Sequence, residues 1–241
     1  MAEKHEKKAL VQPTFAPIGR TERKYLQSME HYTHIVWDFN GTLLNDVDAC
    51  IQSANRLLIN HGLPAVGSVE DYRAAFGFPI IDYYRRLGFD FEKTPYADLA
   101  VEWVAYYLES AANAPLYPDA TDTLRTVQSK GISQLILSAT EKSMLEKQIE
   151  ALGIRPYLDE ILGLDNIHAY SKREIGLAWR EKNPDARLLF VGDTDHDAQV
   201  AAAMGADCIL VTTGHQPRRV LESLHPLAVV DSLGEICKKY L

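Results

Sequence analysis

Residues 35–44 read IVWDFNGTLL, in which an apolar run ends in Asp38 and an amide, Asn40, follows two positions later. The apolar residues of 34–39 (HIVWDF) do not alternate with polar ones, which is typical of a central strand in a parallel sheet that is covered on both faces. An acid directly after such a strand lies at its carboxyl end, where open α/β sheets bind their ligands. This stretch therefore predicts a buried first strand with a ligand site at its end.

Beyond position 113 the chain alternates between apolar, strand-like segments and amphipathic, helix-like segments. Strands are predicted at 132–139, 186–193 and 207–214, with a turn and a short strand at 154–164, and helical patterns fill the intervals. Such alternation predicts βα units around a parallel sheet with helices on both faces. We therefore predict an α/β protein whose core is a doubly wound parallel sheet.

A block of purely helical signals interrupts this core after its first strand. Apolar residues recur at spacings of three and four from 47 to 61, and residues 68–113 contain three further helical patterns. The predicted organisation is therefore a core at 32–46 and 114–241, an all-helical insertion at 47–113, and an N-terminal tail at 1–31 with a short helix near 22–29.

Composition excludes several classes of protein. The 241 residues are 46% hydrophobic, enough for a full core, and the net charge of -8 argues against a nucleic-acid partner. No apolar run reaches the roughly 18 residues of a membrane span, and the first ten residues are not followed by the apolar region of a signal peptide. The three cysteines form no CxxC pair, which favours reduced thiols. We predict a cytoplasmic protein without a membrane partner, either a monomer or a homodimer.

Polar side chains stand at the ends of the predicted strands. They are Asp38, Asn40 and Thr42 at the first strand, Ser138, Ala139 and Thr140 at the second, and Asp193, Asp195 and Asp197 at 186–193 and just beyond. Lys172 and Arg173 lie at a helix start between the last two of these groups. Acids, a hydroxyl and a cation at one sheet edge suit a divalent metal with a phosphate better than an apolar ligand.

Each of these residues also has a purely structural interpretation. An acid after a strand often caps a helix or forms a turn, and the run GDTDHD at 192–197 has the composition of a helix start. Ser138 is typical of a strand cap, and Lys172 of a solvated cation near a helix start. The functional interpretation is favoured because all of these residues stand, in order, at strand ends.

Four segments resemble the signature motifs of the haloacid dehalogenase-like (HAD) superfamily of phosphohydrolases: DFNGTLL (38–44), LILSAT (135–140), SKRE (171–174) and LLFVGDTDHD (188–197). The helical block at 47–113 stands where the phosphoglycolate phosphatase-like subgroup carries a small helical cap. The resemblance implies a Rossmann-like core with an inserted cap, and a Mg²⁺-dependent phosphatase mechanism through a phosphoaspartate.

Carried onto this sequence, the resemblance implies a catalytic and metal-binding set. Asp38 would be the nucleophile and a Mg²⁺ ligand, because a carboxylate attacks a dianion poorly unless a metal neutralises both. Asn40 would offer its backbone carbonyl to the metal, and Asp193 would be the second carboxylate ligand. Lys172 would neutralise charge on the phosphoryl oxygens, with Asp197 orienting it.

The resemblance also implies a phosphate-binding set. Ser138 would hydrogen-bond a phosphoryl oxygen, helped by the backbone amides of Ala139 and Thr140. Gly41 would let the backbone turn tightly beneath the phosphate, and Thr42 would brace that loop.

Two positions depart from the family pattern. Arg173 follows Lys172 where the third motif usually has proline, and we predict Lys172 as the motif's cation. Asn40 stands where most phosphatases of the family carry a second aspartate as general acid and base, and an amide does neither job. We therefore expect a slower hydrolase that depends on acidic leaving groups, unless His196 or a residue of the helical block supplies the proton.

The helical block is expected to set the substrate. Its Gly-centred loop FGFP at 76–79 has a position from which such caps reach the site. Arg73, Arg85 and Arg86 are candidates for holding a carboxylate or second phosphate, with solvated helix-face charges as the alternative.

Three functions stay open. The first is a phosphatase for a small phosphorylated metabolite. The second is a phosphotransferase or other non-hydrolytic member of the family, in which Asn40 slows the attack of water. The third is a protein that binds Mg²⁺ and phosphate without turnover.

Overall fold

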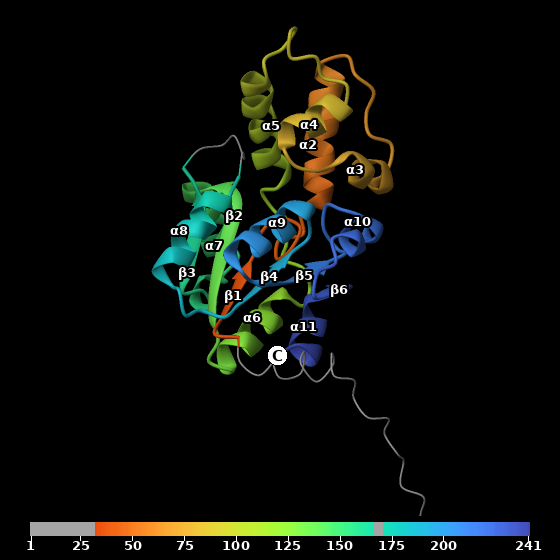
Figure 1. The fold of residues 1–241 in the computed structure, drawn as a ribbon. Coiled ribbons are helices and arrows are strands. Elements are labelled where there is room, and N and C mark those ends of the chain that lie inside the picture. The colour runs from red at the N-terminus through yellow and green to blue at the C-terminus, as the bar shows by residue number, and fades with distance from the viewer. Residues whose placement is uncertain (1–31, 166–170) are drawn as a thin grey trace, which may run out of the picture. The chain divides into compact units, whose positions relative to one another are not determined.

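The structure is a computed structural model that describes residues 32–165 and 171–241. Residues 32–241 form one compact unit. The predicted tail at 1–31, with its short helix, lies outside the described residues. Figure 1 shows the described chain as a strand-and-helix core with a group of helices beyond one edge of the sheet.

The core is built on one six-stranded parallel sheet in the order β3-β2-β1-β4-β5-β6. Its strands are β1 (His34–Trp37), β2 (Ser133–Glu141), β3 (Glu160–Leu164), β4 (Leu188–Gly192), β5 (Asp207–Val211) and β6 (Ala228–Val230). The first strand of the chain lies in the centre and pairs with β2 on one side and β4 on the other. The order reverses direction beside β1, which confirms the predicted doubly wound, Rossmann-like α/β core.

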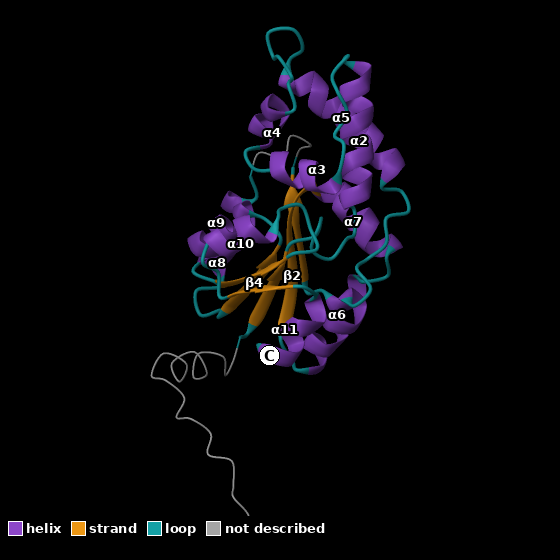
Figure 2. Ribbon diagram, turned by 90° about the vertical axis from the view of Figure 1, so that its right-hand side faces the viewer, coloured by secondary structure: helices purple, strands orange, loops and turns teal. Residues whose placement is uncertain are grey.

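Three helices cover each face of the sheet (Figure 2). One face carries α6 (Ala120–Ser129), α7 (Lys142–Ala151) and α11 (Leu233–Lys239), and the other carries α8 (Arg173–Lys182), α9 (Asp195–Met204) and α10 (Arg218–Ser223). A short 3₁₀ turn, Arg155–Tyr157, precedes β3. Along β1, Ile35 and Trp37 pack on the first face and Val36 on the second, all fully buried. Burial on both faces explains why this strand shows no polar alternation.

Between β1 and α6 the chain forms four helices, here called the helical block: α2 (Val47–Asn60), α3 (Val69–Ala75), α4 (Ile80–Arg86) and α5 (Tyr96–Ser110). They share an apolar core of their own, in which Leu57 and Leu58 of α2 pack with Leu99 and Tyr107 of α5. The block lies beyond the carboxyl ends of the strands, above the central strand in Figure 1. It therefore covers the carboxyl ends of the strands, where the predicted site residues lie.

The described residues contain no helix long and apolar enough to cross a membrane. All three cysteines are free thiols: Cys50 and Cys208 are buried and Cys237 is half-buried.

A buried glutamine ties the central strands to the helices on one face. Gln134 on β2 accepts a hydrogen bond from Trp37 Nε1 at 3.1 Å, and its own Nε2 donates to the carbonyls of Leu124 (2.9 Å) and Tyr157 (3.0 Å). Its side chain is almost fully enclosed. One buried side chain therefore links β1 to α6 and to the turn before β3.

We expect Gln134→Leu to lower the free energy of unfolding by about 2–4 kcal/mol, because it leaves the Trp37 N–H and a carbonyl buried without partners. Urea denaturation followed by tryptophan fluorescence measures this loss. Gln128→Leu is the matched control, since Gln128 makes a single exposed bond to the Pro156 carbonyl. Equal losses in the two variants would contradict the stabilising role of the buried network.

Candidate active site

The loop after β1 is a tight turn that fixes Asp38 at the strand end. The Asp38 N–H continues the pairing with β4 by donating to the Val191 carbonyl at 2.8 Å. The Phe39 carbonyl then accepts from the N–H groups of Leu43 (2.9 Å) and Leu44 (2.8 Å). Asp38 is 7% exposed and lines a cavity between the sheet edge and the helical block.

A buried lysine joins Asp38 to the fourth motif. Lys172 lies just before α8, is 2% exposed, and forms ion pairs with Asp38 and, at 2.7 Å, with Asp197 Oδ1. Arg173 is exposed and pairs with Glu174 at 3.0 Å. Of the two cations considered from the sequence, Lys172 is therefore the one that meets the strand ends.

The acids after β4 combine a structural and an electrostatic role. Thr194 caps α9, and Asp197 completes a capping box by accepting from the Thr194 N–H (2.9 Å) and hydroxyl (2.7 Å). The other oxygen of Asp197 holds Lys172. The helix-cap interpretation and the functional interpretation of this run therefore apply to the same carboxylate.

Three buried carboxylates face a single ammonium group. Ligand oxygens of Asp38, Asp193 and Asp197 all lie within 4.8 Å of one another, and Lys172 pairs with Asp38 and Asp197. Burial raises the pKa of Asp38 well above its ordinary value against the pull of Lys172, and burial raises the pKa of Asp193 to about 6. The excess negative charge is what a divalent cation would offset, and all-oxygen donors suit Mg²⁺ or Ca²⁺. Asp197 Oδ2 accepts three hydrogen bonds and Asp197 Oδ1 pairs with Lys172, whereas each Asp193 oxygen accepts one bond. Asp38 and Asp193 are therefore the carboxylates with more room for a metal.

Asp193 lies against Gly41 and Thr42, two residues that were predicted to bind the phosphate. The Thr42 hydroxyl donates to Asp193 Oδ1 at 3.0 Å, and the side chain is fully buried. Gly41 has φ +74°, and a Cβ there would lie 2.5 Å from Asp193 Oδ2, so the position requires glycine. Neither residue lines the cavity. Thr42 therefore holds Asp193 in place and Gly41 leaves room for it, while their contact with a phosphate stays a prediction.

The second motif lies inside a strand and not after it. β2 extends to Glu141, two residues beyond the predicted end, so Ser138, Ala139 and Thr140 belong to the strand and line the cavity. The Ser138 hydroxyl donates to Thr140 Oγ1 at 3.1 Å and accepts from the Thr140 N–H at 3.1 Å. These three residues thus share the cavity with Asp38 and Lys172.

Asn40 is held by three partners. Its Nδ2 donates to Asp46 Oδ2 and to Tyr107 Oη, both at 2.7 Å, and its Oδ1 accepts from Thr140 Oγ1 at 2.8 Å. Tyr107 Oη also donates to Asp46 at 2.8 Å. Because Asp46 accepts only, the amide nitrogen must face it, which fixes the orientation of the amide. Both amide N–H groups are therefore occupied within the protein.

His215 adds a second cation beneath this network. It follows β5, lies 3.5 Å from Asp46, and donates its backbone N–H to Asp193 Oδ2 at 2.7 Å. Burial favours the neutral imidazole, but the bond to Asp46 and the charges of Asp46 and Asp193 raise the pKa of His215 to about 9. The protonated ring therefore pairs with Asp46, whose own pKa lies below its ordinary value because these bonds outweigh its burial.

Residues 35–211 match the family model described as haloacid dehalogenase-like hydrolase. The chain belongs to this family. The match spans most of the chain and includes all four motifs, so the enzyme class predicted from the sequence is confirmed.

Curated relatives of this hydrolase are phosphoglycolate phosphatases. It is 25% identical over 209 residues to that of Pseudomonas putida, covering 83% of this chain and 76% of the relative. It is 24% identical over 212 residues to that of Vibrio parahaemolyticus, covering 84% and 93%. The predicted phosphoglycolate phosphatase-like resemblance is therefore confirmed.

Solved structures share the fold. A haloacid dehalogenase-like hydrolase from Streptococcus pneumoniae superposes with a TM-score of 0.75 at 18% identity, covering 87% of this chain and 99% of that one. A putative phosphoglycolate phosphatase from Lactobacillus delbrueckii gives 0.73 at 17% identity, covering 87% and 98%. At these identities the likeness concerns the fold alone.

Sequence reasoning missed three members of the site: Asp46, Tyr107 and His215. His215 directly follows the predicted strand at 207–214, so the strand-end rule applied to the other motifs would have found it. Asp46 precedes a helix and resembles an ordinary cap, although its side chain makes no cap hydrogen bond. Tyr107 lies within an apolar helix, and no local signal sets it apart.

We expect Mg²⁺ to raise the melting temperature of the wild-type hydrolase and to leave that of Asp193→Asn unchanged, because the variant loses one of the two available carboxylates. Binding at a hundred times the Kd stabilises the folded state by about 2.7 kcal/mol. Differential scanning fluorimetry with and without EDTA makes the measurement. Asp195→Asn is the isosteric control, since Asp195 bonds Gln216 outside the cluster. A Mg²⁺ shift retained in Asp193→Asn would contradict this site.

We expect Asn40 and Asp46 to be energetically coupled. Asn40→Asp alone sets a partly buried carboxylate against the buried one of Asp46, and Asp46→Asn alone removes the acceptor, whereas the exchanged pair restores one carboxylate and one amide. A double-mutant cycle in urea should give a favourable coupling of about 0.5–3 kcal/mol. Additive effects would show that the contact contributes nothing.

Proposed function

We propose that this hydrolase is a Mg²⁺-dependent phosphatase that acts on a small phosphorylated metabolite through a phosphoaspartate on Asp38. An oxygen of Asp38 bonds to phosphorus while the bond from phosphorus to the ester oxygen breaks, and the leaving oxygen keeps the electron pair. Water then attacks the phosphorus of the acyl phosphate and releases phosphate and free Asp38. The names of the curated relatives support a phosphatase activity.

The observation that carries the proposal is the ion-paired position of Lys172. Its ammonium is buried between Asp38 and Asp197, which raises the pKa of Lys172 despite its burial, so the charge is permanent at neutral pH. A fixed positive charge beside the nucleophile suits the charge on transferring phosphoryl oxygens, and such preorganised charges account for much of an enzyme's rate enhancement. Ser138 and the backbone amides of Ala139 and Thr140 are the proposed further phosphate contacts.

The donor set fits the proposed metal. Asp38, Asp193 and the backbone carbonyl of Asn40 are the proposed ligands, with Thr42 and the His215 N–H holding Asp193 in place. When bound, Mg²⁺ offsets the negative charge shared by the carboxylate and the phosphoryl group. Asp197 is proposed to position Lys172 and not to bind the metal, whose carboxylate ligands are Asp38 and Asp193.

The amide at position 40 sets the limits of this activity. Asn40 has no proton to give a leaving alkoxide, and its amide is already bonded on both sides. General acid–base catalysis typically contributes about 10²- to 10⁴-fold. We therefore propose that the enzyme favours esters whose leaving group departs without protonation.

Turnover of p-nitrophenyl phosphate tests the proposal and the motif assignment together. We expect Asp38→Asn to abolish Mg²⁺-dependent turnover, and Lys172→Ala to lower kcat by about 10²- to 10³-fold, as removal of one charge-stabilising group does. Arg173→Ala is the matched control and should keep the wild-type rate, because Arg173 is exposed and paired with Glu174.

Circular dichroism checks that each variant is folded. The assignment would be contradicted if Asp38→Asn kept the wild-type rate. It would also be contradicted if Arg173→Ala lowered kcat and Lys172→Ala did not. Wild-type protein that binds Mg²⁺ and phosphate without turnover would instead support a binding function.

A further inference from the structure

The cavity above Asp38 is lined largely by aromatic side chains of the helical block. It has a volume of about 170 Å³ and extends from Asp38 and Lys172 to α4 and α5. Its aromatic wall includes Phe76, Phe78, Tyr83, Tyr84, Trp103 and Tyr107. An apolar cavity of about 150 Å³ accommodates a benzene molecule. The cavity therefore suits a compact group with a single ring.

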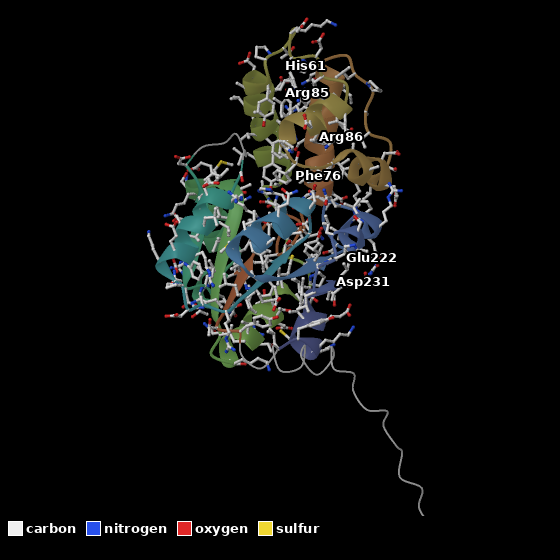
Figure 3. The ribbon with its side chains drawn as sticks, in the orientation of Figure 1. His61, Phe76, Arg85, Arg86, Glu222 and Asp231 are labelled. Carbon is white, nitrogen blue, oxygen red and sulfur yellow. The ribbon has the colours of Figure 1, made fainter. Side chains whose placement is uncertain are left out.

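The loop at 76–79 closes this wall against the core. Phe78 stacks on His196 with ring centroids 4.5 Å apart, and Phe76 lies 4.9 Å from the ring of His215. In Figure 3, Phe76 lies where the helical block meets the core. The loop thus reaches the site, as predicted, but it contributes aromatic rings and no charge.

None of the five lysines and arginines in 47–113 lines the cavity. Arg73 donates to the Gly214 and Thr213 carbonyls, both at 2.8 Å, and Arg86 donates to the Ala75 carbonyl at 2.6 Å. Arg85 pairs with Asp82 at 2.5 Å, and Figure 3 shows it away from the core. The arginines considered as candidates for holding a carboxylate or second phosphate are therefore bonded to other groups.

Two buried polar atoms of the wall lack partners among the described residues: Tyr83 Oη and His196 Nε2. Tyr83 is 4% exposed and His196 is 7% exposed, and both line the cavity. A buried polar group without a partner is costly. A polar substituent on a bound ring would supply the missing hydrogen bonds.

These observations, together with the bonded amide of Asn40, point to one class of substrate. We infer that the site takes phosphate monoesters of uncharged phenols, an inference that rests on the proposed phosphatase function. The ring fills the aromatic wall while Asp38 bonds to phosphorus, and the phenolic oxygen leaves with the electron pair of the broken P–O bond. A phenol ionises near pH 10, far below an alkyl alcohol, so the phenolate leaves without a general acid.

The test compares four substrates with Mg²⁺: acetyl phosphate, phenyl phosphate, benzyl phosphate and phosphoglycolate. We expect both aromatic esters to show a KM roughly 10- to 100-fold below that of phosphoglycolate, because a buried ring replaces an unpaired carboxylate. Phenyl phosphate should exceed benzyl phosphate in kcat, since only its leaving group is acidic. Calorimetry with phenylphosphonate and phosphonoacetate measures the same preference without turnover.

Phe78→Leu should raise KM for phenyl phosphate about 2- to 10-fold, the range of one aromatic contact, and should change KM for acetyl phosphate less, because acetyl phosphate has no ring. Arg85→Ala is the matched control in the helical block and should change neither. The inference would be overturned if the enzyme hydrolysed acetyl phosphate but showed a lower KM for phosphoglycolate than for phenyl phosphate. That result would leave the proposed phosphatase function intact. Silence on all four substrates would overturn both.

Discussion

The buried ammonium of Lys172 is the interaction on which the site depends. It lies just before α8 and bonds two carboxylates, one at the end of β1 and one in the first turn of α9. Removing such an ion pair from water costs several kcal/mol per ion, so the charges must meet in good geometry. The sheet supplies it, because parallel strands bring their carboxyl ends to one edge. The local fold and the electrostatics of the site thus depend on the same three residues, Asp38, Lys172 and Asp197.

Asn40 couples the helical block to this edge. Its amide receives the Thr140 hydroxyl from β2 and donates to Tyr107 from α5, while Asp46 accepts from both Asn40 and Tyr107. His215, in the loop after β5, completes this contact by pairing with Asp46. The residue that would otherwise exchange protons with substrate therefore serves as a hydrogen-bonded bridge between block and core. In the proposed mechanism, the leaving group must therefore depart without a proton from position 40.

Much of this architecture could be predicted from local patterns. The apolar run ending in Asp38 and the helical spacing from 47 are short-range signals, and they correspond to β1 and α2. The strand-end rule also named Asp193, because parallel topology brings separate strand ends together, and Lys172 was named at a predicted helix start as the cation of the third motif.

Other features could not be predicted locally. Tyr107 meets Asn40 only because α5 packs against α2, and Arg73 meets the Gly214 carbonyl only because α3 docks on the core. The three arginines looked like anion ligands because nothing in the sequence shows which carbonyl or acid they bond. The contact of Gly41 and Thr42 with Asp193 could not be predicted for the same reason, since it joins residues far apart in the chain.

The most direct test of this account is the dependence of kcat/KM on leaving-group pKa across para-substituted phenyl phosphates of similar size. Without a proton donor at position 40, the rate should fall steeply as the phenol becomes less acidic, because the developing phenolate charge is left unprotonated. A steep negative slope is the predicted result. A flat dependence would contradict the account, since it would mean that another group protonates the leaving oxygen.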